Sequence, residues 1–249
     1  MSDAELTRAA AIGSVGSGLG QLYRLLLRLQ VTTLRILGIA ALGLVAVLLA
    51  LAVRGDSDSL RATAEIVLGY GLGIVLPLAV AWLATSSIGE LVDDRLLVYL
   101  WLKPVPRWQL PTAATLATVS IVAPLVGVPL ILAVVVAGAT ELIAAVAAAT
   151  VVATLAYAGL FVAAGLWLRR ALWWTLLYVL VWENGLARAV DGAARLSIAS
   201  YAQSLVADAA DLRLSYADRS LLASVVVPLV VAALGLALAV VRYRRAEVD

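Results

Sequence analysis

Long runs of apolar residues, separated by short polar segments, dominate the pattern along the chain. A helix of roughly 18 or more apolar residues is long enough to cross the hydrocarbon core of a bilayer. The pattern therefore predicts an all-α integral membrane protein that forms a single transmembrane domain over residues 1–249. Six transmembrane helices are predicted, at about residues 33–53, 66–86, 112–136, 142–166, 171–189 and 221–241.

A stripe of polar residues precedes the first predicted span. Its members fall at steps of three and four: Gln21, Arg24, Arg28, Thr32 and Arg35. This spacing places them on one face of a helix that is otherwise built of apolar residues. A basic amphipathic helix of this kind favours the interface of a membrane. The alternative is that the arginines only flank the first span.

The fifth predicted span is irregular. Its apolar part, ALWWTLLYVLVW, ends after 12 residues at Glu183 and Asn184. Glu183 lies about 18 Å along such a helix, where a charge costs about 2.5–3.5 kcal/mol on insertion scales. Trp182, Glu183 and Asn184 are therefore candidates for a polar point on a substrate path or for a hinge. The alternative is that the span is short and Glu183 meets the outer head groups. Residues 185–220 are predicted to form outer amphipathic helices, partly re-entrant, before the last span.

The composition supports the membrane assignment and excludes several chemistries. The chain is 64% hydrophobic and 14% charged, with a mean hydropathy of +1.05, far from the balance of soluble domains. It has no Cys and no His, which excludes Cys–His nucleophile pairs, HExxH zinc sites and histidine proton relays. No metal site and no cofactor are predicted in this chain. Lys103 is the only lysine and no GxxxxGK[ST] motif is present, so a P-loop is excluded as well.

The distribution of basic residues predicts the orientation. When the ends of six spans are assigned alternately to two faces, 12 of the 18 basic residues fall on the face that carries both termini. Short cytoplasmic loops are enriched in Lys and Arg. The sequence thus predicts a multi-pass protein of the cell membrane with both termini in the cytoplasm.

A polar segment, residues 90–110 (ELVDDRLLVYLWLKPVPRWQL), separates the second and third spans. An acidic cluster is followed by a short Leu, Tyr and Trp helix and then by Lys-Pro-Val-Pro-Arg. This order resembles the ABC-2 type permeases, the membrane subunits of ATP-binding-cassette exporters. The matching residues are Glu90, Asp93, Asp94, Arg95, Leu96, Tyr99, Leu100, Leu102, Lys103, Pro104, Val105, Pro106 and Arg107.

The segment departs from the family pattern at two points, which bear on the subfamily more than on the family. Asp94-Arg95 stands where the family usually has Gly-Thr, and Gln109-Leu110-Pro111 stands where a lysine is common.

The resemblance implies a coupling helix, about Asp94–Leu102, that docks on a separate cytosolic ATPase. The residues implied to couple are Glu90, Asp94, Arg95, Tyr99, Trp101, Lys103, Pro104, Pro106 and Arg107. Among them the aromatic side chains would be anchors, the basic ones rim contacts, and the prolines would fix the turn. The alternative is a basic and aromatic loop that anchors at lipid head groups.

What the resemblance further implies is a transport subunit that is not itself an enzyme. ATP and Mg would be bound by the partner ATPase. The other partners would be a second permease copy, identical or related, and membrane lipid, with no nucleic acid. Two alternatives remain: a non-transporting membrane scaffold or assembly subunit that uses the same loop, and a secondary transporter that uses Glu183.

Overall fold

The structure is a computed structural model that describes residues 18–55, 58–93, 106–189, 191–212 and 219–245. It is 89% helical, and no strand occurs within these ranges. Five helices are long and apolar enough to cross a membrane: Thr33–Ala52, Ser59–Ser86, Gln109–Ala137, Thr140–Trp167 and Leu221–Arg245. Over the described residues, they confirm the prediction of an all-α chain with several helices of the length and hydropathy of membrane-spanning segments.

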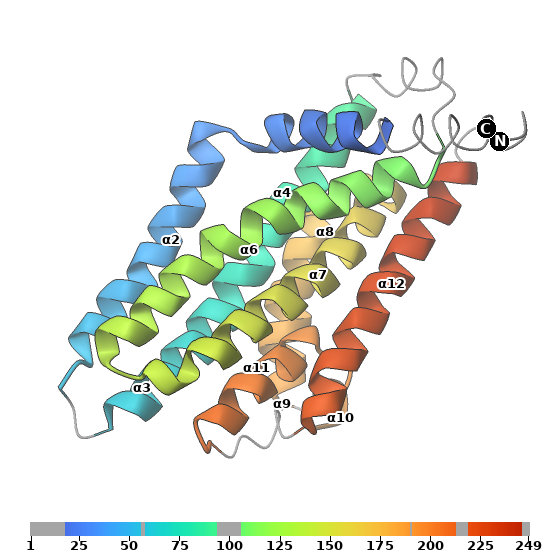
Figure 1. Ribbon diagram of the computed structural model, residues 1–249. Coiled ribbons are helices and arrows are strands. Elements are labelled where there is room, and N and C mark those ends of the chain that lie inside the picture. Colours follow the sequence, from blue (N-terminus) through green and yellow to red (C-terminus); the bar gives the residue numbers. More distant parts are fainter. Residues whose placement is uncertain (1–17, 56–57, 94–105, 190, 213–218, 246–249) are drawn as a thin grey trace, which may run out of the picture.

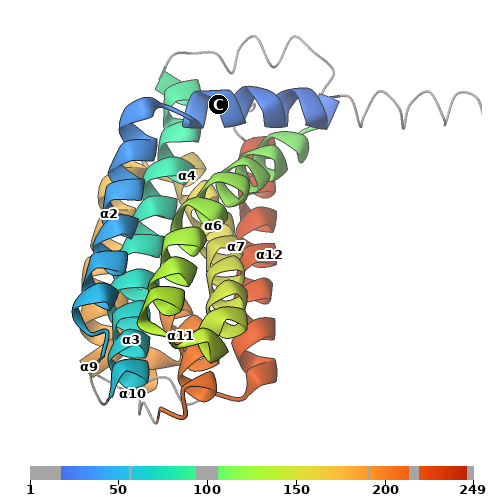
Figure 2. The ribbon, with the colours of Figure 1, turned by 60° about the vertical axis from the view of Figure 1, so that its left-hand side comes forward.

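The long helices run side by side in one bundle (Figures 1 and 2). Helix α2 (Thr33–Ala52) packs against α6 (Gln109–Ala137), and α6 against α7 (Ile143–Trp167), which a short 3₁₀ segment, η2 (Thr140–Leu142), precedes. Helix α12 (Leu221–Arg245) lies on the far side of α7. Helix α4 (Leu76–Asp93) contacts both α6 and α7, so these three helices enclose the centre of the core.

A helical segment, residues 18–30, lies across one end of the bundle (Figures 1 and 2). Leu22, Leu26 and Gln30, four residues apart, form its buried face, whereas Arg24 and Arg28 are exposed. Gln30 Nε2 donates to Thr118 Oγ1 of α6 at 3.1 Å, which ties the segment to the bundle. This transverse helix has the amphipathic character that the sequence predicts, but it ends at residue 30 rather than continuing to Arg35.

The second long helix begins earlier than predicted. It starts at Ser59 with α3 (Ser59–Ile66), becomes π-helical in η1 (Val67–Val75) and continues as α4. Within η1, Gly71 is the position of close approach, because a Cβ there would lie 2.5 Å from Leu130 Cδ2. The neighbouring Gly69 faces open space.

Residues 171–189 are helical but do not form a regular span. They comprise α8 (Ala171–Leu177), the π-helical η3 (Tyr178–Leu186) and α9 (Ala187–Ala189). This segment is not among the five helices that are long and apolar enough to cross a membrane. The interruption falls where the sequence places Glu183 and Asn184 within the fifth predicted span.

The predicted outer segment, residues 185–220, contains α10 (Asp191–Ala194) and α11 (Ile198–Ala209). The sequence predicts outer amphipathic helices, partly re-entrant, and α11 differs from an amphipathic helix because every residue from Ile198 to Ala207 is buried. Helix α11 packs between α7, α12 and η1, at the end of the bundle opposite the transverse helix (Figures 1 and 2). The polar side chains of α11 form hydrogen bonds inside the protein, so the helix does not need a face exposed to solvent.

The backbones of α7 and α12 touch at a pair of glycines. A Cβ on Gly159 would lie 2.6 Å from Ala232 O, and one on Gly235 would lie 2.6 Å from Gly159 C. Small residues permit this approach between membrane helices, where packing replaces the hydrophobic effect as the main attraction. The contact holds α12 against the core although most of its leucines and valines are exposed on the outside of the bundle.

Candidate functional site

Glu183 is the centre of a buried polar cluster between η3 and α11. Its side chain is 2% exposed. Oε1 accepts hydrogen bonds from the Tyr178 hydroxyl at 2.8 Å and from the Ile198 N–H at 3.1 Å. Oε2 accepts from the Ser197 hydroxyl and from the Ala199 N–H at 3.3 Å. Glu183 therefore does not meet outer head groups, and four donors surround its carboxylate.

The carboxylate caps the N-terminus of α11 together with Ser197. Ser197 is the N-cap residue, in extended conformation, and its Oγ accepts from the Ser200 N–H at 3.1 Å. Three of the first N–H groups of the helix are thus satisfied, two by Glu183 and one by Ser197. The partial positive charge at a helix N-terminus stabilises an anion placed there. This arrangement offsets the cost of a carboxylate inside an apolar bundle.

The π-helical geometry of η3 brings residues five apart onto one face. In an α-helix, residues i and i+5 point about 140° apart, whereas a π-helix pairs them. Tyr178 reaches Glu183 across this spacing, and Asn184 Nδ2 donates to Val179 O at 2.9 Å across the same spacing. The π-helical turn is therefore a condition for the cluster to form.

Side-chain amides satisfy carbonyl groups in both π-helical segments. Asn184 Nδ2 also donates to Gly73 O of η1 at 2.9 Å. Gln203 Nε2, from α11, donates to Leu68 O of η1 at 2.7 Å. A bilayer offers no partner for a backbone carbonyl, so the protein must supply one. Two amides thus connect η1, η3 and α11 into one unit.

Aromatic side chains cover the cluster on the side of α7. Tyr178 packs edge-on against Phe161 with ring centroids 6.0 Å apart, and Phe161 packs against Tyr157 at 5.4 Å. Tyr157 is fully buried, and its hydroxyl has no hydrogen-bond partner among the described residues. The predicted site residue Trp182 is half-buried and makes none of the polar contacts of the cluster described here.

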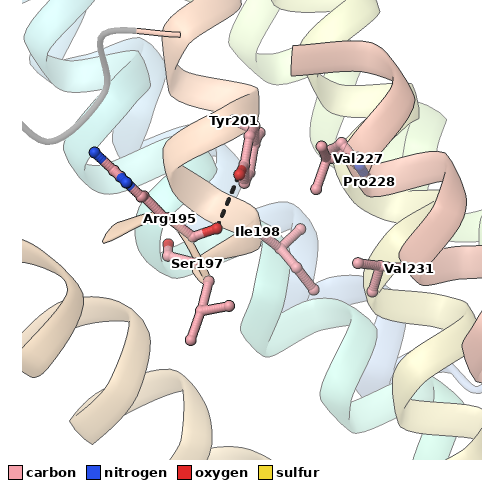
Figure 3. A pocket seen from close by; sticks show the side chains of 8 residues that line it. Arg195, Ser197, Ile198, Tyr201, Val227, Pro228 and Val231 are labelled. Carbon is pink, nitrogen blue, oxygen red and sulfur yellow. Dashed lines mark hydrogen bonds between the residues drawn. The ribbon is translucent and has the colours of Figure 1, made fainter. Parts of the chain in front are cut away.

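A small apolar cavity of about 100 Å³ adjoins the α11 N-terminus (Figure 3). Ser197, Ile198 and Tyr201 border it from α11, and Val227, Pro228 and Val231 border it from α12. Tyr201 donates from its hydroxyl to Arg195 O at 2.8 Å and so closes one side. The cavity lies between α11 and the part of α12 that contains Pro228.

Most of the residues implied to couple lie outside the described part of the chain. These are Asp94, Arg95, Tyr99, Trp101, Lys103 and Pro104. Glu90 belongs to the last turns of α4, and Pro106 and Arg107 immediately precede α6. Arg107 Nη1 donates to Arg244 O near the end of α12 at 3.4 Å. The start of α6 and the end of α12 therefore meet at the end of the bundle that the transverse helix crosses.

Comparison of the chain with protein-family models, with curated proteins and with solved structures finds no match. The fold and the cluster define the class only as a helical protein with several membrane-length helices and a buried carboxylate-capped helix.

Sequence reasoning found Glu183 and Asn184 but missed Tyr178, Ser197 and Gln203. Glu183 and Asn184 are evident because they interrupt an apolar run. Tyr178 lies five residues away, a spacing that no α-helical pattern connects with Glu183. Ser197 carries a recognisable signal, since a serine before a helix is a preferred N-cap.

Proposed function

We propose that the chain is the membrane-spanning permease subunit of an ABC exporter, which couples ATP hydrolysis by a separate ATPase subunit to translocation of a substrate. The observation that carries this proposal is the sequence of the polar segment, residues 90–110, with its acidic cluster, its stretch of Leu, Tyr and Trp, and its Lys-Pro-Val-Pro-Arg motif. An ATP-driven transport subunit that has no P-loop of its own needs a partner that hydrolyses ATP and a surface on which that partner acts.

The arrangement of the bundle supports this proposal. The segment leaves α4 and enters α6 at the end where the transverse helix lies and where α12 terminates with Arg242, Arg244 and Arg245. Arg107 joins that segment to α12 through Arg244 O. A force applied to the segment would therefore reach α4, α6 and α12 together.

The proposal includes six spans, with residues 171–189 as the irregular fifth, and both termini in the cytoplasm. The chain has no natural cysteine, so single cysteines report topology directly. In intact cells, a membrane-impermeant maleimide should label Arg54→Cys and should leave Arg107→Cys unlabelled until the cells are opened. The reverse labelling pattern would contradict the orientation.

The coupling role is tested by capture of an ATPase from native membranes with the full-length chain as bait. We expect the wild-type chain to retain a protein with Walker motifs and ATPase activity. Tyr99→Ala combined with Arg107→Ala should lower the captured activity about tenfold or more, because both proposed anchor types are removed. The amount of inserted protein should be unchanged.

The matched control is Arg24→Ala combined with Arg28→Ala, which removes two exposed arginines from the transverse helix at the same end. This variant should capture the ATPase as the wild type does. Equal capture by the Tyr99/Arg107 variant, or no ATPase with the wild-type bait, would refute the proposal. A partner without nucleotide-binding motifs would favour the scaffold alternative.

The geometry of Glu183 gives little support to a secondary transporter. All four contacts of its carboxylate are donated by the protein, and two of them come from the backbone of α11. A carboxylate that carried a proton or cation through a transport cycle would have to give up these contacts in each cycle.

A further inference from the structure

An open cavity of about 1040 Å³ lies at the end of the bundle that the transverse helix crosses. Arg35 borders it from the first turn of α2, and Arg242 borders it from the last turns of α12. Arg169 and Arg170 border it from the connection between α7 and α8, and Trp82 lines it from α4. The buried Glu183 cluster makes no part of its lining.

The described lining of the cavity is rich in positive charge. It holds four guanidinium groups, and none of the described residues that border it is Asp or Glu. Like charges around one cavity repel each other, and an anion among them relieves that repulsion. The planar guanidinium group presents paired N–H donors whose spacing matches the oxygens of a phosphate.

Arg242 adds an independent indication of a ligand. Its guanidinium lies 5.6 Å from the centroid of the Trp167 ring, which fixes its position. Its Nε is buried and has no hydrogen-bond partner in the described part of the chain. Buried donors are nearly always paired in folded proteins, so a donor left open beside a cavity indicates a missing acceptor.

The connection that carries Arg169 and Arg170 is held in an unusual backbone conformation. Arg170 has φ 60° and ψ 43°, the left-handed region that side chains other than Gly and Asn rarely adopt. Such conformations persist where the surrounding structure requires them. Here the turn places two consecutive exposed arginines at the rim of the cavity.

Apolar side chains adjoin the arginines. Leu166 and Leu172 line the cavity, and so does Trp167, whose side chain is 52% exposed. A site at a helix end with cationic and apolar walls suits a ligand with an anionic head and an apolar tail.

We propose that this cavity binds the phosphate of one anionic phospholipid head group, with the acyl chains along the outer surface beside Trp167. The arginines bind the phosphate, and the Nε–H of Arg242 donates one of the hydrogen bonds. This site goes beyond the proposed transport function and does not depend on an ATPase partner.

The test measures lipid binding by the purified full-length chain in an uncharged detergent. Native mass spectrometry follows titration with phosphatidylglycerol and, in parallel, with phosphatidylcholine. We expect one saturable phosphatidylglycerol per chain and no saturable phosphatidylcholine. Arg169→Gln combined with Arg170→Asn should weaken phosphatidylglycerol about thirtyfold, as expected for two arginines that attract an anionic lipid. Asn is chosen because it tolerates the left-handed conformation.

The matched control is Arg54→Gln combined with Arg195→Gln, which removes the same charge from exposed positions away from the cavity. It should bind phosphatidylglycerol as the wild type does. An equal loss in the control, or no saturable binding by the wild type, would overturn the proposal. Arg242→Gln provides a second variant at a different element, and unchanged binding in both cavity variants would also overturn it.

Soluble anions distinguish a lipid from a free phosphate. Inorganic phosphate and glycerol phosphate lack the apolar tail, so neither should displace phosphatidylglycerol at equimolar concentration. Displacement by either anion at that ratio would show that the site takes a free phosphate and would overturn the lipid assignment.

Discussion

Glu183→Gln changes the buried cluster while the shape of the side chain is preserved. The glutamine keeps one oxygen, which can still accept from two donors. Its amide group, however, replaces the second oxygen and then faces two donors of the protein. Whichever carboxylate oxygen the amide group replaces, one of the two donors that it faces is a backbone N–H of α11. A backbone N–H can only donate, so it cannot pair with the amide N–H.

The size of the effect follows from two opposing contributions. Two hydrogen bonds to a charged acceptor are lost, which costs about 3–6 kcal/mol in total. The variant no longer buries a charge, which returns about 2.5–3.5 kcal/mol. The midpoints of the two ranges differ by about 1.5 kcal/mol of destabilisation, which corresponds to a roughly tenfold increase in the population of molecules with α11 detached.

The assay measures the labelling of a single introduced cysteine, which is possible because the chain has no cysteine of its own. Ser204→Cys places a thiol on α11 at a position that is 3% exposed, so a maleimide reaches it only when the helix detaches. We expect Glu183→Gln to raise the labelling rate about tenfold over the Ser204→Cys parent. Glu141→Gln, at an exposed glutamate, is the matched control and should leave the rate unchanged. Equal labelling rates for the two variants would refute the assignment of Glu183 as the anchor of α11.

Three further variants probe the same bundle by unfolding of the purified protein in mixed micelles. Gly159→Ala should destabilise by about 1–3 kcal/mol, because the added methyl group meets Ala232 O at 2.6 Å, whereas Gly69→Ala, which meets nothing within 4 Å, should change stability little. Asn184→Leu should cost about 1–3 kcal/mol through the loss of two hydrogen bonds to π-helical carbonyls. Tyr178→Phe removes one of the four donors to the Glu183 carboxylate and should cost about 1–2 kcal/mol. This cost is smaller than that of Asn184→Leu, which leaves two backbone carbonyls without the Asn184 donor. Wild-type stability in Gly159→Ala would show that α7 and α12 separate without penalty.

The long helices could be predicted from hydropathy within a few residues. The third and sixth predicted spans, 112–136 and 221–241, lie inside α6 and α12. The error at the second span has a clear cause. Residues 59–65 contain Arg61 and Glu65, which form an ion pair at 3.1 Å on the surface of α3, so the helix extends beyond the apolar run that defines the predicted start.

The burial of α11 could not be predicted from its residue types. Ser200, Gln203 and Ser204 give the segment the mixed polarity of a surface helix. In the fold, Ser200 donates to Ala194 O and Ser204 donates to Ser200 O, so both bond to nearby backbone carbonyls. Gln203 donates to Leu68 O of η1. The chain distance between Gln203 and Leu68 leaves no local pattern from which this contact can be inferred.

The two π-helical segments explain why the Glu183 cluster forms and why the sequence pattern did not predict it. A π-helical turn shifts backbone hydrogen bonds from i+4 to i+5 and leaves carbonyl groups short of a partner. In an apolar environment those groups require donors from the protein. Asn184 serves one carbonyl in each segment, Val179 O in η3 and Gly73 O in η1. A polar side chain within an apolar run therefore indicates irregular backbone close to it in space, and that irregularity also creates the i+5 spacing through which Tyr178 reaches Glu183.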